Sequence, residues 1–261
     1  MNPPTENSKS PKFPWVRLFR IFVVASVIGA VIYTGLSASK QLSENDFDFR
    51  NTEFGWWIAA IGCYIVTLVL SSFFWHRVLV AMGQSPKFGK SLLAFFASQL
   101  GKYIPGKAMV VVIRTDMIRG DKVGTAPAAA SVFVETLTWI FVGSAIASLL
   151  LIFRFQDQVG LQITAALLTI VAGVLTWPPI FRAIALKLGA AKGRSVAKAF
   201  SGLDFSTMSF GWVVMALGWC FNGFSLWLVL KGLPDTNVTI ADFPLTLACV
   251  CLLYTSDAAD E

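Results

Sequence analysis

The sequence predicts an all-α, polytopic membrane protein with about six transmembrane helices, the last one truncated, and one re-entrant helical hairpin. Its 261 residues are 56% hydrophobic and only 14% charged, and the mean hydropathy is +0.67. Long apolar runs alternate with short basic loops, and one apolar stretch is broken in its middle by Pro and Gly. This composition excludes an ordinary soluble domain. The net charge of +6 belongs to Lys and Arg beside apolar runs, so it indicates membrane topology and not nucleic-acid binding.

The N-terminal part predicts a tail followed by a first span. Residues 1–15 are polar and Pro-rich, which is typical of a disordered cytoplasmic tail. The apolar run Phe19–Leu36 is long enough to cross a bilayer. A cleaved signal peptide is the rival interpretation, because the small residues of Ser37–Ser39 follow the run. The length of the run Phe19–Leu36 and the spans that follow it favour a retained transmembrane helix.

A second span is predicted at Phe54–Phe74. Trp56 and Trp57 would lie at one membrane interface and Trp75 at the other, as an aromatic belt requires. We expect His76 to be a surface residue at that second interface.

The stretch Ser91–Arg114 predicts a re-entrant hairpin. Its middle, GKYIPGK, contains Pro105, which removes a backbone donor and ends a helix. Each remaining arm is shorter than the roughly 20 residues needed to cross a 30 Å hydrocarbon core. The two arms therefore enter and leave by the same face. Irregular backbone at membrane depth survives only inside protein or beside a wet cavity, and this tip also carries Lys102 and Lys107.

Four further spans complete the predicted topology. We expect them at Pro127–Phe153, Val159–Phe181, Phe210–Leu230 and from Phe243 onward. The loop Arg182–Asp204 is strongly basic and therefore cytoplasmic. With the hairpin re-entrant, Lys and Arg concentrate on one side, which predicts a multi-pass protein with a cytoplasmic N-terminus.

The last eleven residues, 251–261, differ abruptly in composition from the run before them. They resemble a translated sequencing adapter, so we expect the membrane domain to cover residues 16–250 and the natural chain to continue beyond Val250.

Glu135 is the sharpest single candidate for function. It falls near mid-membrane in the predicted third span, where Ser131 and Thr138 share its helix face. A charge at the bilayer centre costs about 2.5–3.5 kcal/mol, so the carboxylate needs a partner or a proton.

The candidate partners of Glu135 are Lys102, Lys107 and Arg114. In one interpretation Lys102 or Lys107 binds an anionic head group in a cavity, and Glu135 balances that charge or relays a proton. In the other, Glu135 only fixes the hairpin to the third span through a buried ion pair. The residues leave both interpretations open.

Other patterns carry less chemistry. A stripe of small and polar residues on the fifth span favours close helix packing, through Gly211, Gly218, Asn222 and Ser225. The four Cys and the one His have no metal-ligand spacing, so we expect neither a metal site nor a cofactor.

The segments Trp75–Gly83 (WHRVLVAMG) and Ser98–Lys107 (SQLGKYIPGK), followed by Arg114 and Glu135, resemble the family of the lysylphosphatidylglycerol synthase transmembrane region, also called flippase-like. The resemblance covers roughly Phe19–Val250. It implies a helical fold with re-entrant segments in the inner membrane of a bacterial or archaeal cell, and phospholipids as partners. The residues that match the family motif are Lys102, Tyr103, Pro105, Gly106, Arg114 and Glu135.

The expected function is to bind or translocate phospholipid. The alternatives are the membrane subunit of a lipid-modifying transferase for aminoacyl or glycosyl groups, with Glu135 as a base, and a non-catalytic scaffold or transporter. Since these residues contain no soluble aminoacyl-transferase domain, we do not expect an enzyme acting alone. The sequence leaves a homo-oligomeric assembly open.

Overall fold

The computed structural model describes residues 53–103, 108–120, 122–154, 157, 159–177, 179–180, 183, 202–234 and 236–257, with six isolated positions between residues 29 and 40. Within these ranges four helices are long and apolar enough to cross a membrane. They are α2 (Phe54–Ala81), α5 (Thr125–Arg154), α6 (Val159–Thr176) and α9 (Phe205–Lys231). The structure therefore confirms the predicted class, an all-α polytopic membrane protein.

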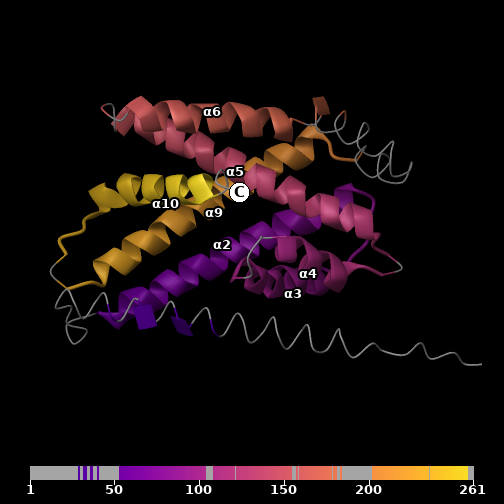
Figure 1. Ribbon diagram of the computed structural model, residues 1–261, viewed down its shortest axis with the longest axis horizontal. Helices are drawn as coiled ribbons and strands as arrows, with labels where there is room; N and C mark the ends of the chain where they lie inside the picture. The colour runs from indigo at the N-terminus through magenta and orange to yellow at the C-terminus, as the bar shows by residue number, and fades with distance from the viewer. Residues whose placement is uncertain are drawn as a thin grey trace, which may run out of the picture.

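A shorter apolar helix, α10 (Phe243–Asp257), follows the 3₁₀ turn η3 (Ile240–Asp242) and packs on α9 and α5 (Figure 1). It begins where the sixth span was predicted. Apart from isolated positions, the predicted first span and most of the basic loop 182–204 lie outside the described residues.

The centre of the fold is formed by α2, α5 and α9. α2 packs most extensively against α9, and α6 lies along the outer side of α5 (Figure 1). Trp139 and Trp219 stack with ring centroids 4.3 Å apart, and the Trp219 Nε1 donates to the Trp139 carbonyl over 3.0 Å. Gly143 lies under the Trp219 ring and Gly211 under Phe74, so tightly that a Cβ at either position would overlap the ring. Only glycine at these two positions leaves room for the Trp219 and Phe74 rings.

Hydrogen bonds also join α2 to α9. The Thr67 hydroxyl donates to the Gly218 carbonyl (3.1 Å), and the Ser225 hydroxyl donates to the Ala60 carbonyl (2.9 Å). The small and polar stripe of the fifth span is thus a packing surface, as its pattern indicated.

Helix boundaries differ from the predicted ones for local reasons. α9 begins five residues early, at Phe205, because the Asp204 carboxylate caps the Thr207 N–H at 2.8 Å. α6 ends at Thr176 and not at Phe181, just before the Pro178–Pro179 pair, which disfavours helical backbone.

The second span was also predicted too short, and this changes the position of Trp75. α2 continues seven residues beyond Phe74, to Ala81. Trp75 therefore lies inside the protein and is fully buried, so its predicted interfacial position is wrong.

Much of the outer surface is apolar, as contact with lipid requires. On α6 more than a third of each of several large aliphatic side chains is exposed, namely Val159, Leu161, Ile163, Leu167, Ile170 and Val171. Such a continuous apolar face would be unusual on a soluble monomer. It supports a multi-pass membrane protein.

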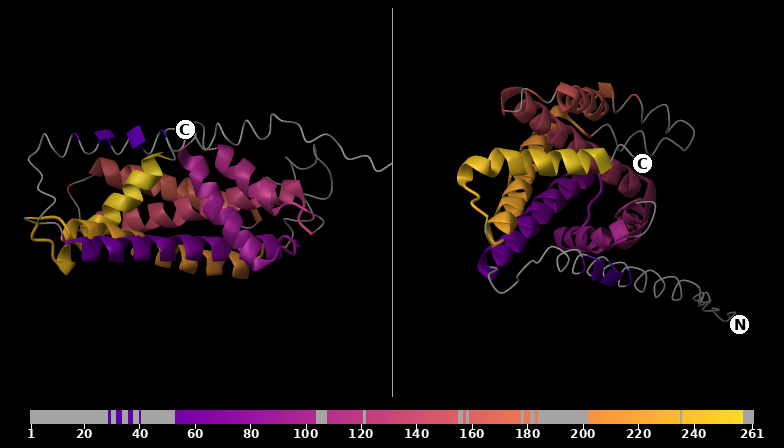
Figure 2. Two further views of the ribbon diagram at one scale, coloured as in Figure 1. Left: turned by 90° about the horizontal axis from the view of Figure 1, so that it is seen from below. Right: turned by 60° about the vertical axis from the view of Figure 1, so that its left-hand side comes forward.

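A helical hairpin lies beside α2 and α5 (Figure 2). Its arms are α3 (Phe88–Gln99) and α4 (Ala108–Ile118), with the 3₁₀ turn η2 (Leu100–Tyr103) after α3. The predicted pair of half-helices is present, although the arms begin three residues before Ser91 and end four residues after Arg114. At 1.5 Å per residue the arms are about 18 and 17 Å long, compared with about 42 Å for α2.

The two outer ends of the hairpin are joined to each other. Ser85, before α3, donates its N–H to the Lys122 carbonyl, after α4, over 3.2 Å. Gly124 donates its N–H to the Gln84 side chain over 2.8 Å. The hairpin therefore begins and ends at the same end of the bundle.

Candidate functional site

A buried ion pair connects the hairpin to α5. Arg114 on α4 donates from Nη1 to Oε2 of Glu135 on α5 at 2.7 Å, and the two side chains are 3% and 8% exposed. Glu135 lies ten residues into α5, about 15 Å from its start. Each charge neutralises the other where water is excluded, which is what a carboxylate in an apolar helix requires.

The guanidinium of Arg114 is held on several sides. Its Nε donates to the Ser98 hydroxyl on α3 over 3.0 Å. Its Cζ lies 4.2 Å from the centroid of the Phe95 ring and 5.1 Å from that of Trp75. Arginine suits such a position, because its planar cation can form hydrogen bonds in its plane and stack on aromatic faces.

The aromatic side of this cluster is itself fixed. The Trp75 Nε1 donates to the Ser131 hydroxyl over 2.8 Å, and that hydroxyl donates to the Ala128 carbonyl over 2.7 Å. We call Trp75, Phe95, Ser98, Arg114 and Glu135 the hairpin cluster. It joins α2, α3, α4 and α5, so one group of side chains sets the position of the hairpin in the bundle.

Glycine is also required at the tip of the hairpin. Gly101 in η2 is buried, and a Cβ there would lie 2.8 Å from the backbone N of Val110 on α4. Backbone cannot move aside as a flexible side chain can. A larger residue would therefore push the two arms apart.

Polar contacts join the two arms of the hairpin at its open end and tie the hairpin to α2. The Lys90 ammonium lies 3.5 Å and 3.4 Å from the carbonyls of Ile118 and Arg119, at the C-terminal end of α4. His76 Nδ1 and the Ser91 hydroxyl are 3.0 Å apart, which ties α2 to α3. His76 is half-buried in this contact, more enclosed than the surface position expected for it.

The structure brings together only some of the predicted site residues. Of the three candidate partners of Glu135, Arg114 forms the ion pair. Lys102 is exposed on η2, and Tyr103 is the last residue of that turn. Pro105, Gly106 and Lys107 lie outside the described residues.

Trp75 and Phe95 were not predicted to belong to a site. Trp75 stands at the head of the motif WHRVLVAMG, and Phe95 lies in the apolar arm before the tip. Their roles depend on how α2 and α3 cross, and no spacing within either segment reveals that. Ser98 and Ser131, by contrast, lie in the tip motif and on the polar face of the third span.

The hairpin cluster holds one pair of opposite charges. Within the described part of the chain, no three His, Cys, Asp or Glu side chains lie close enough together to hold a metal ion. The Glu135 carboxylate already accepts from Arg114, and that pairing favours a structural role for it.

Fold and site together define a multi-pass helical membrane protein whose broken helical hairpin is fixed in the bundle by a buried Arg–Glu pair. The family model described as the lysylphosphatidylglycerol synthase TM region matches residues 15–255. The chain belongs to this family. No curated protein and no solved structure matched the chain in the corresponding searches.

Proposed function

We propose that the protein binds phospholipid and moves it across the membrane, with the hairpin re-entering the bilayer from the cytoplasmic side. The observation that carries the proposal is the exposed Lys102 at the hairpin tip. The buried Arg114–Glu135 pair fixes the hairpin arm α4 to α5, and so it fixes the position of the tip.

The re-entrant placement is supported by lengths and contacts. An arm of about 18 Å cannot cross a hydrocarbon core of about 30 Å. Both outer ends of the hairpin meet at one end of the bundle, joined by the Ser85 and Gln84 hydrogen bonds. The tip therefore reaches into the membrane region without leaving on the other side.

The orientation follows from charge. Basic residues gather around the open end of the hairpin, namely Arg77, Lys87, Lys90, Arg119 and Lys122. At the other end of α2 and α9, Glu53 and Asp242 accompany Lys231. The positive-inside rule favours the basic end as cytoplasmic. If the expected first span Phe19–Leu36 crosses the membrane once, the N-terminus lies on that side as well.

A cation at the tip gives the hairpin a chemical role. A phosphate head group entering hydrocarbon loses its hydration, and an ammonium at the hairpin tip would offset part of that cost. The acyl chains would remain against the apolar outer faces of the helices. The transferase alternative is less well supported, because a base must reach its substrate and Glu135 is buried in an ion pair.

Lipid scrambling in liposomes tests this proposal. With the full-length protein and a fluorescent phosphatidylglycerol, Lys102→Ala should slow the loss of lipid asymmetry, whereas Lys102→Arg should retain most of the rate. Lys122→Ala is the matched control, since Lys122 is exposed at the base of the hairpin. Equal rates for Lys102→Ala and the unmodified protein would remove the tip from the mechanism, and a protein with no scrambling activity would contradict translocation.

A further inference from the structure

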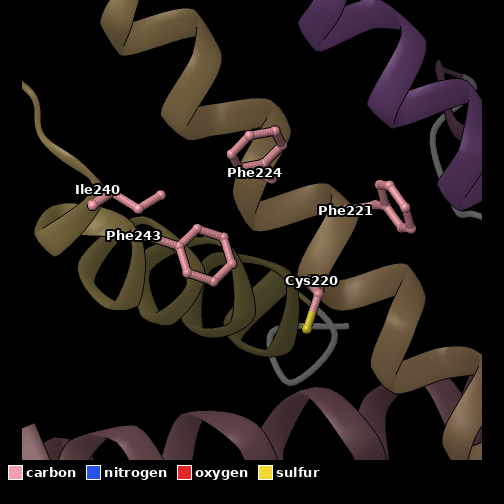
Figure 3. A pocket seen from close by; sticks show the side chains of 5 residues that line it. All are labelled: Cys220, Phe221, Phe224, Ile240 and Phe243. Carbon is pink, nitrogen blue, oxygen red and sulfur yellow. The ribbon is translucent and has the colours of Figure 1, made fainter.

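An apolar groove of about 250 Å³ lies between α9 and the start of α10, on the part of α9 that leads to its C-terminal end. It is lined by Cys220, Phe221, Phe224, Ile240 and Phe243. Figure 3 shows Cys220, Phe224 and Phe243 around the space between the two helices, with Ile240 just before α10 and the Phe221 ring on the side of α9 away from α10. The hairpin cluster contains none of these residues.

The walls of the groove are formed by packed aromatic rings. Phe224 stacks on Trp227 with centroids 5.2 Å apart and meets the Phe243 ring edge-on at 6.1 Å. Trp227 is anchored in turn, because its Nε1 donates to the Thr239 carbonyl over 2.7 Å. At Gly223 a Cβ would lie 2.9 Å from the Leu247 Cα, so the helices touch there. The groove is therefore a preformed feature of the α9–α10 contact.

The depth of the groove places it in hydrocarbon. Phe224 lies seven residues, or about 10 Å, before the end of α9 at Lys231, and Cys220 lies about 6 Å further from that end. α9 is about 40 Å long, compared with a hydrocarbon core of about 30 Å. The groove thus lies within the apolar layer and opens toward the tails of lipids. Phe221 and Ile240, two of its lining residues, are 37% and 68% exposed.

A cation stands above the groove, at the level of head groups. The Lys231 ammonium donates to the Val238 carbonyl over 3.1 Å, in the loop that leads to Ile240. An ammonium has three donors, and this contact uses one. A phosphate oxygen is a fitting acceptor for another, since charge-assisted hydrogen bonds are the stronger kind.

We propose that this groove binds one acyl chain of a phospholipid whose phosphate lies beside Lys231. Drug-sized ligand pockets occupy about 300–1,000 Å³, so a groove of about 250 Å³ suits a single chain segment better than a folded small molecule. The site lies in the half of the bilayer opposite the open end of the hairpin. Lipid binding here does not depend on translocation.

Photocrosslinking in bilayers tests the site. The full-length protein is reconstituted with a phospholipid that carries a diazirine in the middle of one acyl chain, and adducts are mapped by mass spectrometry. We expect adducts concentrated on the groove residues. Cys220→Trp fills the groove and should reduce these adducts several-fold. Leu217→Trp, on the same helix and 49% exposed, is the control and should leave them unchanged.

Lys231→Met should reduce the groove adducts of a phosphatidylglycerol probe while the protein stays folded, as judged by its elution from a sizing column. Adducts spread evenly over exposed positions such as Val213 and Ile163 would overturn the proposal, and so would adducts that persist in Cys220→Trp.

A second copy of the chain is the rival occupant. In a full-length variant in which Ser replaces every cysteine except Cys220, a short bis-maleimide should leave the protein monomeric if lipid fills the groove. Efficient Cys220–Cys220 crosslinking would assign the groove to a protein interface and overturn lipid binding. Because the crosslinking readouts need no scrambling, the groove and the proposed translocation can fail separately.

Discussion

On the side of α2 that faces α9, the helices meet through glycines, aromatic rings and hydrogen bonds between uncharged groups, whereas on the side that faces the hairpin they meet around a buried pair of charges. Gly211 admits the Phe74 ring on the first side. On the second side Trp75, the next residue along α2, contacts Arg114. Helix association in a membrane gains little from the hydrophobic effect, so both close packing and polar contacts are available means.

The difference suggests different tolerances. Packing against α9 relies on shape, and any added atom disturbs it. The hairpin cluster relies on matched charges, and the loss of one partner leaves the other charge buried. Substitutions that separate volume from charge should therefore affect the two sides unequally.

The largest expected effect is at the buried ion pair. Arg114→Ala should lower the free energy of unfolding by about 3–5 kcal/mol, because it leaves the Glu135 carboxylate without its cation. Replacing both residues by Met should restore much of the loss, since no charge then remains buried. Thermal unfolding in detergent, followed by the monomer fraction on a sizing column, compares the stabilities of the unmodified protein, the single variant and the double variant.

Arg119→Ala is the matched control for this test. Arg119 pairs with Asp116 at 2.8 Å, close to Arg114 in the chain, but the two side chains are 60% and 48% exposed. An exposed pair of this kind contributes about 0–1 kcal/mol. Equal losses for Arg114→Ala and Arg119→Ala would show that the hairpin cluster does not hold the hairpin.

The next effect concerns the glycine side of α2. Gly211→Ala should destabilise by about 1–3 kcal/mol, because the new Cβ overlaps the Phe74 ring, which is fully buried and cannot turn outward. Gly62→Ala, on α2 itself, is the control: no atom lies within 4 Å of the place its new methyl group would take, so it should be neutral or slightly stabilising. The same thermal assay compares them. A neutral Gly211→Ala would mean that α2 and α9 approach less closely than the structure shows.

Much of this organisation could be predicted from the sequence, because the membrane imposes strong patterns. Span lengths and a Pro–Gly break were enough to predict the four long helices that the structure describes and the pair of half-helices in the hairpin. A lone carboxylate in an apolar helix, Glu135, also signals a buried partner. The sequence could not show that this partner is Arg114 and not Lys102 or Lys107. That choice depends on how far α4 is shifted along α5, which the sequence pattern of neither helix reveals.

The position of Trp75 was mispredicted for an instructive reason. Tryptophan is enriched at membrane interfaces, and the apolar run of the second span stops just before it. The helix nevertheless continues through His76 and Arg77 to Ala81, because neighbouring segments receive these polar side chains: Ser91 contacts His76, and the Phe210 ring lies 5.1 Å from the Arg77 Cζ. The preference of tryptophan for membrane interfaces was overridden by tertiary contacts between residues that are far apart in the sequence.

The smallest expected effect is at the open end of the hairpin. Lys90 is exposed, and its ammonium lies near the last carbonyls of α4, where a cation contributes about 0.3–1 kcal/mol. Lys90→Met should therefore lower the unfolding temperature slightly, and only at low ionic strength, since salt screens exposed charges. Lys87→Met is the control: Lys87 precedes the N-terminal end of α3, where a cation is unfavourable, so its loss should be neutral or stabilising. At about 1 M salt the Debye length is near 3 Å, so an exposed charge should contribute little. If Lys90→Met still lowers the unfolding temperature there, the Lys90 ammonium makes a buried contact, and the open end of the hairpin is stabilised by buried charge as the Arg114–Glu135 pair is.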